Sequence, residues 1–317
     1  TTTLPLSLEE MIPGVRDRLT IITRDSEGMW SVFWDPAFRV PKLEEIQAFD
    51  GSIDGELRAQ FDRGGQYVAL TGSPEGDAIT LVGAPQGLQN ESALATAQVS
   101  WHASEVGRLA WTEFDGADTT VLVASVSPAT GSVTTPEAIL TVSGLAELSR
   151  FDRHGFIIRN DYTRAFDPKG QLMWEAEGIW PASANDSILF VVDEGRQWLQ
   201  VDRLTGAPIE DRRLRGFSID DAAFWVSTTE DTDLITRIVA DPDEGRFSMT
   251  TVGGGMRAPR ITSFDEPLYP VRFTRNGQFF VFTDRARTEL VFVDWWNGAQ
   301  YTVPMPDGHT FFDFHLG

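Results

Sequence analysis

"FTRNGQFFVFTD" at 273–284 and "FDRGGQYVALTG" at 61–72 are two versions of one twelve-residue pattern. Each begins with an aromatic residue, runs through a polar stretch to Gly-Gln and a second aromatic residue, and continues as a short apolar run that reaches Thr. A polar, Gly-containing turn between strand-forming segments is typical of two antiparallel strands joined by a tight connection. The chain therefore repeats one strand–turn–strand unit at positions about 210 residues apart.

Looser versions of the pattern occur throughout the chain, as "WHASEVGRLAWTE" at 101–113, "FDRHGFIIRND" at 151–161, "WPASANDSILFVVD" at 180–193 and "FSIDDAAFWVST" at 217–228. "GVRDRLTIITRD" at 14–25 contains only the second half. The apolar runs begin near Leu19, Tyr67, Leu109, Phe156, Ile188, Ala223 and Phe279, at spacings of 48, 42, 47, 32, 35 and 56 residues. The mean spacing is close to the period of about 40–45 residues that is typical of four-stranded propeller blades.

The segments after each run indicate further strands rather than helices. "LQVDRLTGAP" at 199–208 and "VFVDWWNGAQ" at 291–300 each read as a strand, a turn containing Gly, and the start of the next strand. Helical spacing is confined to "LSLEEMI" at 6–12 and "KLEEIQAF" at 42–49. Each unit is therefore predicted to be a small antiparallel sheet, and such sheets bury their faces when they pack radially.

The predicted fold is all-β: a seven-bladed β-propeller of four-stranded antiparallel sheets, in one domain that covers residues 1–317. Six or eight blades remain alternatives because two spacings are short and one is long. Residues 1–13 are interpreted as an N-terminal extension, and the Thr-rich start suits the remnant of a stalk or linker.

The two chain ends are expected to share one blade. "FFDFHL" at 311–316 reads as an innermost strand, whereas "RLTIITRD" at 18–25 reads as a second strand with no first strand before it. Pairing these segments would close the ring and remove two sheet edges. Strict alternation predicts that Phe312, Phe314 and Leu316 share one apolar face of the last strand.

One segment carries a family resemblance. "PVRFTRNGQFFVFTDRARTELVFVDWWNGAQYTV" at 270–303 resembles the repeat of TolB-type bacterial propellers, a WD40-like group. Phe273, Asn276, Gly277, Asp294 and Gly298 stand at that repeat's aromatic, Asp-Gly, strand Asp and turn Gly positions. No copy has the family's Ser-Pro pair or a Trp-Asp ending, and residues 185–210 lean towards quinoprotein-type repeats. The resemblance implies the fold, and it implies that the protein binds something, often another protein.

Composition excludes several classes of function. The 317 residues carry a net charge of −21, which argues against a nucleic-acid or anionic-membrane binder. No cysteine is present, so thiolate catalysis, Cys-bound zinc and iron–sulfur clusters are excluded. No apolar run reaches the ~18 residues of a membrane span. With the Thr-rich start, these features favour a bacterial protein outside the cytoplasm, either secreted, periplasmic or anchored through a preceding segment.

The candidate binding residues flank the repeat aromatics on the predicted innermost strands. The residues directly before these aromatics are Gln60, Ser100, Arg150 and Arg272. The two arginines could bind a carboxylate or an acidic segment of a partner. The alternative is that both arginines pair with local acidic residues. Trp295 and Trp296 lie in a predicted turn, and this pair is the best candidate for an exposed contact with a protein partner.

His102 and His315 occupy matching positions after the aromatics and are a candidate metal pair. The sequence lacks H-x-H and HExxH spacing, which favours structural roles for both histidines. Acidic clusters at 230–233 and 241–245 leave Ca²⁺ as an open option, although the EF-hand order of ligands is absent. No other cofactor is predicted.

The motif search favours binding over catalysis. The chain contains no G-x-S-x-G elbow, no P-loop and no G-x-G-x-x-G after a strand. The favoured hypothesis is a monomeric, non-catalytic propeller that serves as a protein- or peptide-binding scaffold. The alternative is a propeller enzyme, either a lactonase-like hydrolase or a quinoprotein-like oxidoreductase, with a metal or cofactor at the centre of the ring.

Overall fold

The structure is a computed structural model that describes residues 6–46, 57–72, 78–85, 93–96, 98–177, 179–184, 188–193, 198–209, 223–228, 234–241, 246–252, 260–264 and 268–316. Within these residues the chain forms one short helix, α1 (Leu8–Met11), and 27 strands in seven antiparallel sheets. Strand is thus the main secondary structure, as the sequence predicted. No helix in this part of the chain is long and apolar enough to cross a membrane.

The sheets follow one another along the chain. The first contains β27 (Thr310–Leu316), β1 (Leu19–Arg24), β2 (Met29–Trp34) and β3 (Lys42–Ile46), in that order. The second contains β4 (Arg58–Phe61), β5 (Val68–Gly72), β6 (Ile79–Gly83) and β7 (Ala93–Leu94). The third contains β8 (Val99–Trp101), β9 (Arg108–Phe114), β10 (Asp118–Ser125) and β11 (Glu137–Ser143). The fourth contains β12 (Glu147–Asp152), β13 (Gly155–Arg159), β14 (Tyr162–Phe166) and β15 (Leu172–Glu177).

The remaining sheets continue in the same direction. The fifth contains β16 (Ile179–Ala184), β17 (Ile188–Asp193) and β18 (Trp198–Asp202). The sixth contains β19 (Ala223–Thr228), β20 (Ile235–Asp241), β21 (Arg246–Val252) and β22 (Arg260–Phe264). The seventh contains β23 (Tyr269–Phe273), β24 (Phe279–Thr283), β25 (Glu289–Asp294) and β26 (Gln300–Pro304).

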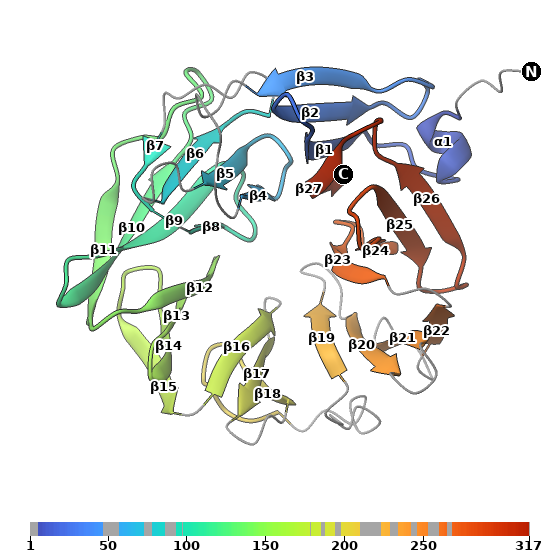
Figure 1. Cartoon of the computed structure of the whole chain (residues 1–317). Coiled ribbons are helices and arrows are strands. Elements are labelled where there is room, and N and C mark those ends of the chain that lie inside the picture. Colours follow the sequence, from blue (N-terminus) through green and yellow to red (C-terminus); the bar gives the residue numbers. More distant parts are fainter. Residues whose placement is uncertain are drawn as a thin grey trace, which may run out of the picture.

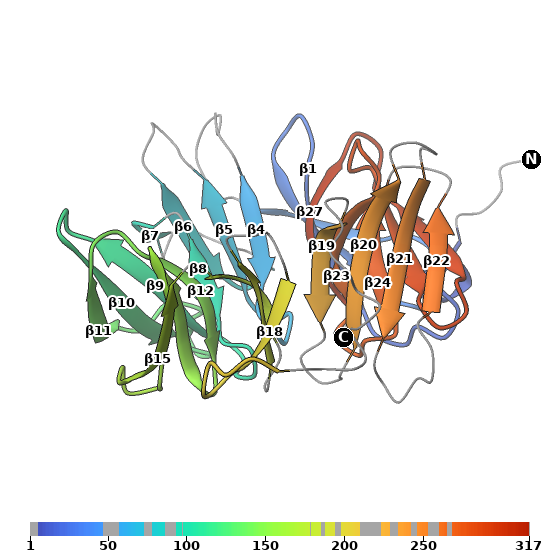
Figure 2. The same ribbon diagram turned by 90° about the horizontal axis from the view of Figure 1, so that it is seen from below.

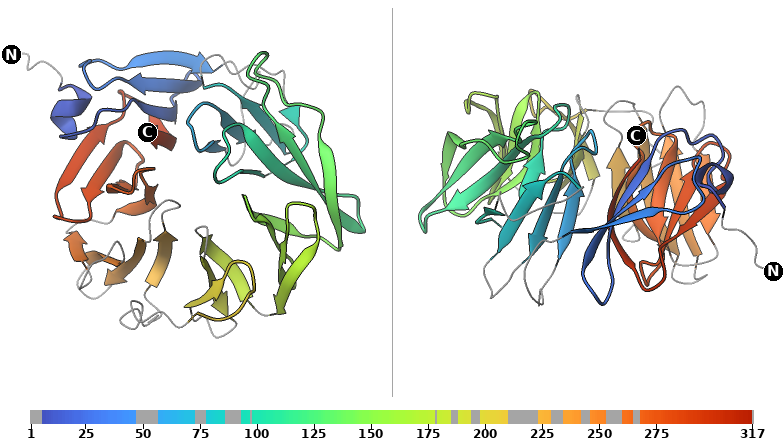
Figure 3. Two further views of the ribbon diagram at one scale, coloured as in Figure 1. Left: turned by 180° about the vertical axis from the view of Figure 1, so that it is seen from behind. Right: turned by 90° about the horizontal axis from the view of Figure 1, so that it is seen from above.

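The sheets stand around a common centre, with strands such as β4, β12, β16, β19, β23 and β27 on the inside and β3, β11, β15, β22 and β26 on the outside (Figure 1). An edge-on view shows the strands running across the thickness of the ring (Figure 2). Views from behind and above show the same arrangement, with the red C-terminal strand beside the blue N-terminal ones (Figure 3).

The duplicated dodecapeptide forms the same connection in both places, between the innermost strand of a sheet and the second strand. Gly65 donates its N–H to the carbonyl of Asp62 at 3.1 Å, and Gly277 donates to the carbonyl of Thr274 at 2.8 Å. Both glycines have positive φ, at 63° and 68°, a conformation that favours glycine over other residues. At Gly65 a Cβ would also lie only 2.3 Å from the ring of His315.

The last strand pairs antiparallel with β1, from Leu19 opposite Leu316 to Ile22 opposite Asp313. The register then shifts, so that Thr23 lies opposite Phe311 and Phe312 has no opposite residue. The prediction that this strand alternates strictly is therefore wrong. A β-bulge inserts Phe312 as an extra residue, so side chains on the two sides of the bulge no longer follow one alternating pattern.

The bulge decides which core each phenylalanine of β27 joins. Phe311 and Phe314, with Leu316, are buried among side chains of the seventh sheet, whereas Phe312 packs against the cluster that contains Phe61 of the second sheet. One strand thereby supplies apolar side chains to the packing on both of its sides. Similar register shifts occur in other first strands, between Leu148 and Arg150, Pro181 and Ser183, Ala223 and Trp225, and Pro270 and Arg272.

The predicted positions of the second strands require one correction. The apolar run near Ala223 is β19, the first strand of its sheet, and not a second strand. The second strand is β20, so second strands start at 188, 235 and 279, which are 47 and 44 residues apart. The irregular spacings of 35 and 56 residues thus arose because the first strand β19 was taken for the second strand β20. The two are easily exchanged in a sequence, since first and second strands are both apolar.

The two segments with helical spacing have different outcomes. α1 forms as predicted, with a capping box in which the Ser7 and Glu10 side chains satisfy each other's backbone N–H groups. The segment at Lys42–Ile46 is instead β3, which pairs with β2, while residues 47–49 lie outside the described residues. Pairing to an existing sheet overrides the weak local preference for helix.

The segment interpreted as an N-terminal extension is partly packed onto the sheets. Leu8 and Ile12 are fully buried in a cluster with Val303 and Met305 of the seventh sheet and its following turn. Residues 8–12 therefore contribute to the apolar core between the first and last sheets.

Candidate functional site

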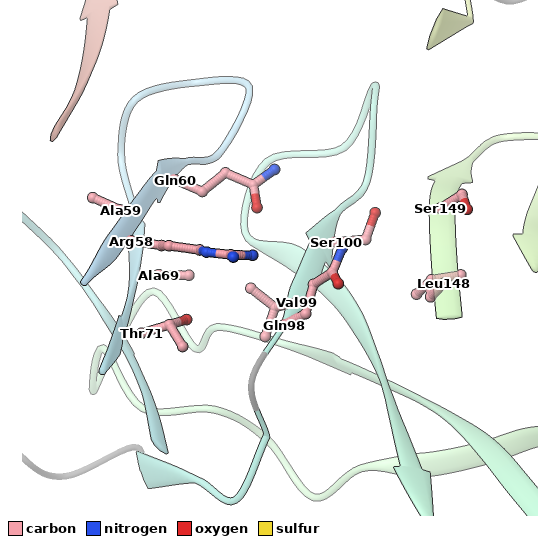
Figure 4. A pocket seen from close by; sticks show the side chains of 10 residues that line it. All are labelled: Arg58, Ala59, Gln60, Ala69, Thr71, Gln98, Val99, Ser100, Leu148 and Ser149. Atoms are coloured by element: carbon pink, nitrogen blue, oxygen red, sulfur yellow. The ribbon is translucent and has the colours of Figure 1, made fainter. Parts of the chain in front are cut away.

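A pocket with a cavity volume of about 260 Å³ lies between the innermost strands of the second, third and fourth sheets (Figure 4). The ten lining residues come from β4, β5, β8 with the residue before it, and β12: Arg58, Ala59, Gln60, Ala69, Thr71, Gln98, Val99, Ser100, Leu148 and Ser149. It therefore lies on the inner side of the sheets, at the ends of the strands away from the repeat turns.

Strand alternation explains the polar walls of the pocket. Arg58 and Gln60 are two residues apart on β4, so they point to the same face, and both are exposed. Gln98 and Ser100 repeat this spacing at β8. Figure 4 shows Arg58 and Gln60 extending from β4 towards β8. Two strands thus present four polar side chains to one space.

The fourth sheet completes the pocket through its bulge. Leu148 and Ser149 are neighbours on β12, and both line the cavity. The register shift between Leu148 and Arg150 leaves Ser149 without an opposite residue on β13. The bulge thus places a buried Leu and an exposed Ser beside the same space.

Hydrogen bonds between sheets fix the spacing of the pocket walls. The Trp101 indole N–H donates to the carbonyl of Gln60 at 2.9 Å, which joins the third sheet to the second. Asp62 accepts from the N–H of Gly107 at 3.0 Å, and Ala103 donates its N–H to the carbonyl of Phe151 at 2.9 Å. The pocket is therefore preformed by contacts that do not involve a ligand.

The pocket has one formal charge, the guanidinium of Arg58, among its ten lining residues. The other polar groups are amides and hydroxyls, which can donate hydrogen bonds. None of the ten is Asp, Glu, His, Lys or Tyr, so the lining offers no pair of groups for general acid–base chemistry.

Arg150 and Arg272, the candidates from the sequence, do not line this pocket. The Nε of Arg150 lies 2.7 Å from Oδ2 of Asp152, and Arg203 reaches the same carboxylate from the fifth sheet at 3.1 Å. Burial acts to raise the pKa of Asp152, but the two guanidinium groups outweigh it and hold the pKa below its usual range. Arg150 thus pairs with a local acidic residue, which the sequence analysis gave as the alternative to ligand binding.

Arg272 forms the matching contact on the other side of the ring. Its Nη2 lies 2.9 Å from Oδ1 of Asp313, and it also donates to the carbonyl of Phe314. Asp313 accepts from the N–H of Phe61 at 2.9 Å, so it links three sheets. Burial raises the pKa of Asp313, while Arg272 and this N–H oppose the shift.

His102 and His315 lie at contacts between sheets rather than together in one site. Nε2 of His315 lies 3.1 Å from the carbonyl oxygen of Arg63 in the second sheet. The ring of His102 meets Phe151 of the fourth sheet edge-on, with centroids 4.6 Å apart. The described ranges contain no group of three or more His, Asp and Glu residues arranged to hold a metal ion.

The backbone around His102 determines which ring nitrogen carries the proton. Its Nδ1 accepts from the N–H groups of Ser104 at 3.2 Å and Glu105 at 3.0 Å, so the ring proton is on Nε2, 3.5 Å from the Glu105 carboxylate. Burial lowers the pKa of His102, Glu105 and Asp152 raise it, and Arg108 and Arg150 lower it. The net direction is downward.

This geometry predicts a loss of stability in mild acid. Below about pH 6.5 the unfolded chain binds a proton at His102 that the folded protein does not, so the free energy of unfolding falls from there towards the lowered pKa. His102→Asn keeps an acceptor for the two N–H groups but cannot be protonated. Melting temperatures between pH 7.5 and 5 should therefore fall less in this variant, whereas parallel curves would show that His102 does not carry the effect.

The structure places the two tryptophans differently, with one packed and the other exposed. Trp295 is half-buried and donates its indole N–H to the carbonyl of Gly277 at 2.6 Å. Trp296 is 52% exposed, and the guanidinium of Arg260 stacks over its ring at 4.4 Å. Both lie in the turn between β25 and β26, away from the pocket.

Sequence reasoning identified Gln60 and Ser100 as positions beside the repeat aromatics but missed Arg58, Gln98 and Ser149. The signal for Arg58 and Gln98 was present, because residues two positions apart on a strand share a face. Ser149 could not be found in this way, since its place depends on the bulge in β12.

The comparisons with known proteins were made at the level of sequence and of structure. No protein-family model and no curated protein sequence matches the chain. The β-propeller domain of Cps50 (Swd1) from Myceliophteria thermophila superposes with a TM-score of 0.53 at 12% identity, over 82% of this chain and 89% of that one. The chain has the β-propeller fold. The fold implied by the resemblance to TolB-type and WD40-like repeats is thereby confirmed.

Two further solved structures that superpose on the chain are described as different kinds of protein. Sqt1 from Saccharomyces cerevisiae superposes with a TM-score of 0.54 at 10% identity, over 95% of this chain and 88% of that one. A "putative 6-phosphogluconolactonase" from Bacteroides uniformis gives 0.58 at 12% identity, over 94% and 99% of the two chains. Identities this low show the shared fold alone.

Proposed function

We propose that the protein is a single-domain, seven-bladed β-propeller that acts outside the cytoplasm as a non-catalytic binding scaffold. The seven described sheets support the blade number, and the pairing of β27 with β1 supports closure of the ring. The proposed ligand is a protein or peptide segment that inserts one residue into the pocket between β4, β8 and β12.

The lining of the pocket carries this proposal. It combines one guanidinium, two side-chain amides and three hydroxyl groups with a floor formed by buried Ala69, Val99 and Leu148. Such a surface binds by hydrogen bonds and charge, whereas hydrolysis requires a positioned base, nucleophile or metal. Binding is therefore the activity that the described side chains of the pocket support best.

A propeller enzyme remains the second candidate, because a protein described as a lactonase shares the fold. An enzyme of this kind would place its reacting groups near the centre of the ring, where the pocket also lies. The two candidates can be distinguished with the purified protein. An enzyme converts a substrate into a product, whereas a scaffold binds its ligand and leaves it unchanged.

The test is a selection of peptides from a random displayed library on the immobilised protein. We expect peptides that bind the wild type and bind Ser149→Tyr at least tenfold more weakly, a loss of about 1.4 kcal/mol, because the ring fills the pocket. Arg18→Ala, at an exposed ion pair with Asp35 on the first sheet, is the control and should bind normally. Failure to select any peptide, or lactone hydrolysis with a stoichiometric bound metal ion, would contradict the proposal.

A further inference from the structure

We propose that the protein has a second interaction surface, separate from the pocket, which binds a basic segment of another protein through one large apolar side chain. The surface lies where the third and fourth sheets meet, at the strand ends that carry the β9–β10 turn (Figure 1). Its centre is formed by Phe114 and Leu145, which are 47% and 70% exposed. Neither residue lines the pocket, so the inference does not depend on the proposed function.

Hydrogen bonds hold the segments of Phe114 and Leu145 side by side. Phe114 is the last residue of β9 and lies opposite Thr119 of β10. The Thr119 hydroxyl donates to the carbonyl of Gly144 at 2.7 Å and accepts from the N–H of Ala146 at 3.0 Å. Gly144 and Ala146 are the two neighbours of Leu145 in the chain. Opposite residues of antiparallel strands project from the same face, so Phe114 projects to the side on which Leu145 lies.

The backbone of this surface is ordered without a partner. Gly144 donates its N–H to the carbonyl of Ala117 at 2.8 Å, which ties the β11–β12 connection to the β9–β10 turn. Within that turn, Oδ1 of Asp115 accepts from the N–H groups of Asp118 at 2.8 Å and Ala117 at 2.9 Å. These hydrogen bonds lower the pKa of Asp115, so it is ionised at neutral pH. A preformed surface requires less ordering when a partner binds.

Carboxylates surround the two apolar side chains. They lie at the ends of β9, β10 and β12 and in the neighbouring turns: Glu113, Asp115, Asp118, Glu147 and Asp161. Asp161 belongs to the turn between β13 and β14, and the side-chain amide of its neighbour Asn160 donates to the carbonyl of Ser143 at 3.4 Å. This hydrogen bond places the turn beside the end of β11. Acidic groups therefore come from both sheets.

The five carboxylates are not neutralised by arginines. Within the described part of the chain, none of them forms an ion pair. Glu113 and Asp118 each accept a hydrogen bond from a neutral side chain, which leaves the charge in place. The basic residues at these strand ends are Arg159 and Arg164, and Arg164 pairs with Glu175 at 3.2 Å. The surface is therefore negative around an apolar centre.

This charge determines which kind of partner fits. A second copy of the chain, docked through the same surface, would bring the same carboxylates together, and an anionic membrane would be repelled as well. A protein segment with Lys or Arg on both sides of one large apolar residue meets both features. Its charges face the carboxylates, and its apolar side chain covers Phe114 and Leu145.

The experiment measures binding of the blocked pentapeptide Lys-Lys-Trp-Lys-Lys by calorimetry. It should bind the wild type about tenfold more tightly than the same peptide with Ser in place of Trp. Phe114→Ser and Leu145→Ser should each remove most of this difference. Leu172→Ser, at a leucine of β15 that is 52% exposed, is the matched control and should retain it. Melting temperatures show whether each variant is folded.

The contribution of charge is tested with apolar contacts unchanged. The double variant Glu147→Gln with Asp161→Asn should bind the Trp peptide more weakly than the wild type. Glu27→Gln with Asp307→Asn removes two exposed carboxylates of other turns and should bind normally. Raising the salt from 10 to 100 mM shortens the Debye length from about 30 to about 10 Å, so binding to the wild type should weaken.

Three results would overturn the inference. Phe114→Ser and Leu145→Ser variants that bind like the wild type would show that the peptide binds elsewhere, and the proposal for the pocket would be unaffected. A Ser peptide that binds as tightly as the Trp peptide would indicate attraction to the net charge alone. Dimerisation of the wild type that Leu145→Ser abolishes, measured by sedimentation equilibrium, would identify a second copy as the partner.

Discussion

We expect a chain that ends at Gly308 to unfold or aggregate rather than to fold as a shortened propeller. The deletion removes β27, with buried Phe311, Phe314 and Leu316, each worth about 1.5–3 kcal/mol of burial. It also leaves the backbone of β1 without the partner that it has from Leu19 to Arg24. The summed loss is comparable to a typical free energy of unfolding of about 5–15 kcal/mol, so the shortened chain should not remain folded.

Size-exclusion chromatography and circular dichroism melts measure the effect of the deletion. Two point variants separate burial from strand pairing. Phe314→Ala, at a side chain that is 1% exposed, should cost about 3–5 kcal/mol while the strand remains. Phe312→Ala, at the half-buried bulge, should cost less. A truncated protein that is soluble, monomeric and close to the parent melting temperature would show that the last strand is dispensable and that the ring is not closed in this way.

The second large effect is expected at the buried ion pair between the fourth and fifth sheets. Arg203 is fully buried and contacts Asp152 through both Nε and Nη2, at 3.2 and 3.1 Å. Removing the Asp152 carboxylate leaves the fully buried guanidinium of Arg203 without this partner, which costs about 3–5 kcal/mol. Asp152→Asn should therefore lower the urea midpoint strongly, whereas Arg203→Ala should cost less because Arg150 still pairs with Asp152.

The control for this prediction is an ion pair of the same type at the surface. Arg18 and Asp35 lie 3.0 Å apart with side chains 48% and 40% exposed, so Arg18→Ala should cost no more than about 1 kcal/mol. The double variant Asp152→Asn with Arg203→Met removes both charges and should recover part of the stability. A single Asp152→Asn variant within 1 kcal/mol of the wild type would mean that the pair does not join the two sheets.

The sequence predicted the repeating unit because that unit depends on local chemistry. The positive φ of Gly65 and Gly277, and the hydrogen bonds across both turns, are encoded in adjacent residues. The strands β5 and β24 follow from apolar runs after these turns. The sequence could not decide whether the run at Ala223 was a first or a second strand, since the choice depends on pairing with distant residues.

The site was predictable only in part, for a related reason. Gln60 and Ser100 were named because they directly precede the repeat aromatics. Strand alternation could have added Arg58, which lies two residues before Gln60 and shares its face. The bulge that brings Ser149 to the pocket is a property of the pairing between β12 and β13, and no residue pattern marks it. Arg150 pairs with Asp152, two residues away on the same strand, as the sequence allowed. The second arginine on this carboxylate, Arg203, could not be predicted because it approaches from another sheet.

The central claim is that the pocket between β4, β8 and β12 binds a protein or peptide segment without catalysis. The most direct measurement is a crystal structure of the protein with the tightest peptide from the library selection. We predict that one residue of that peptide lies in this pocket, within hydrogen-bond distance of the polar side chains that line it, with no change in covalent structure. A peptide bound instead at the exposed Trp296, or a metal ion at the centre of the ring with a cleaved ligand beside it, would contradict the claim.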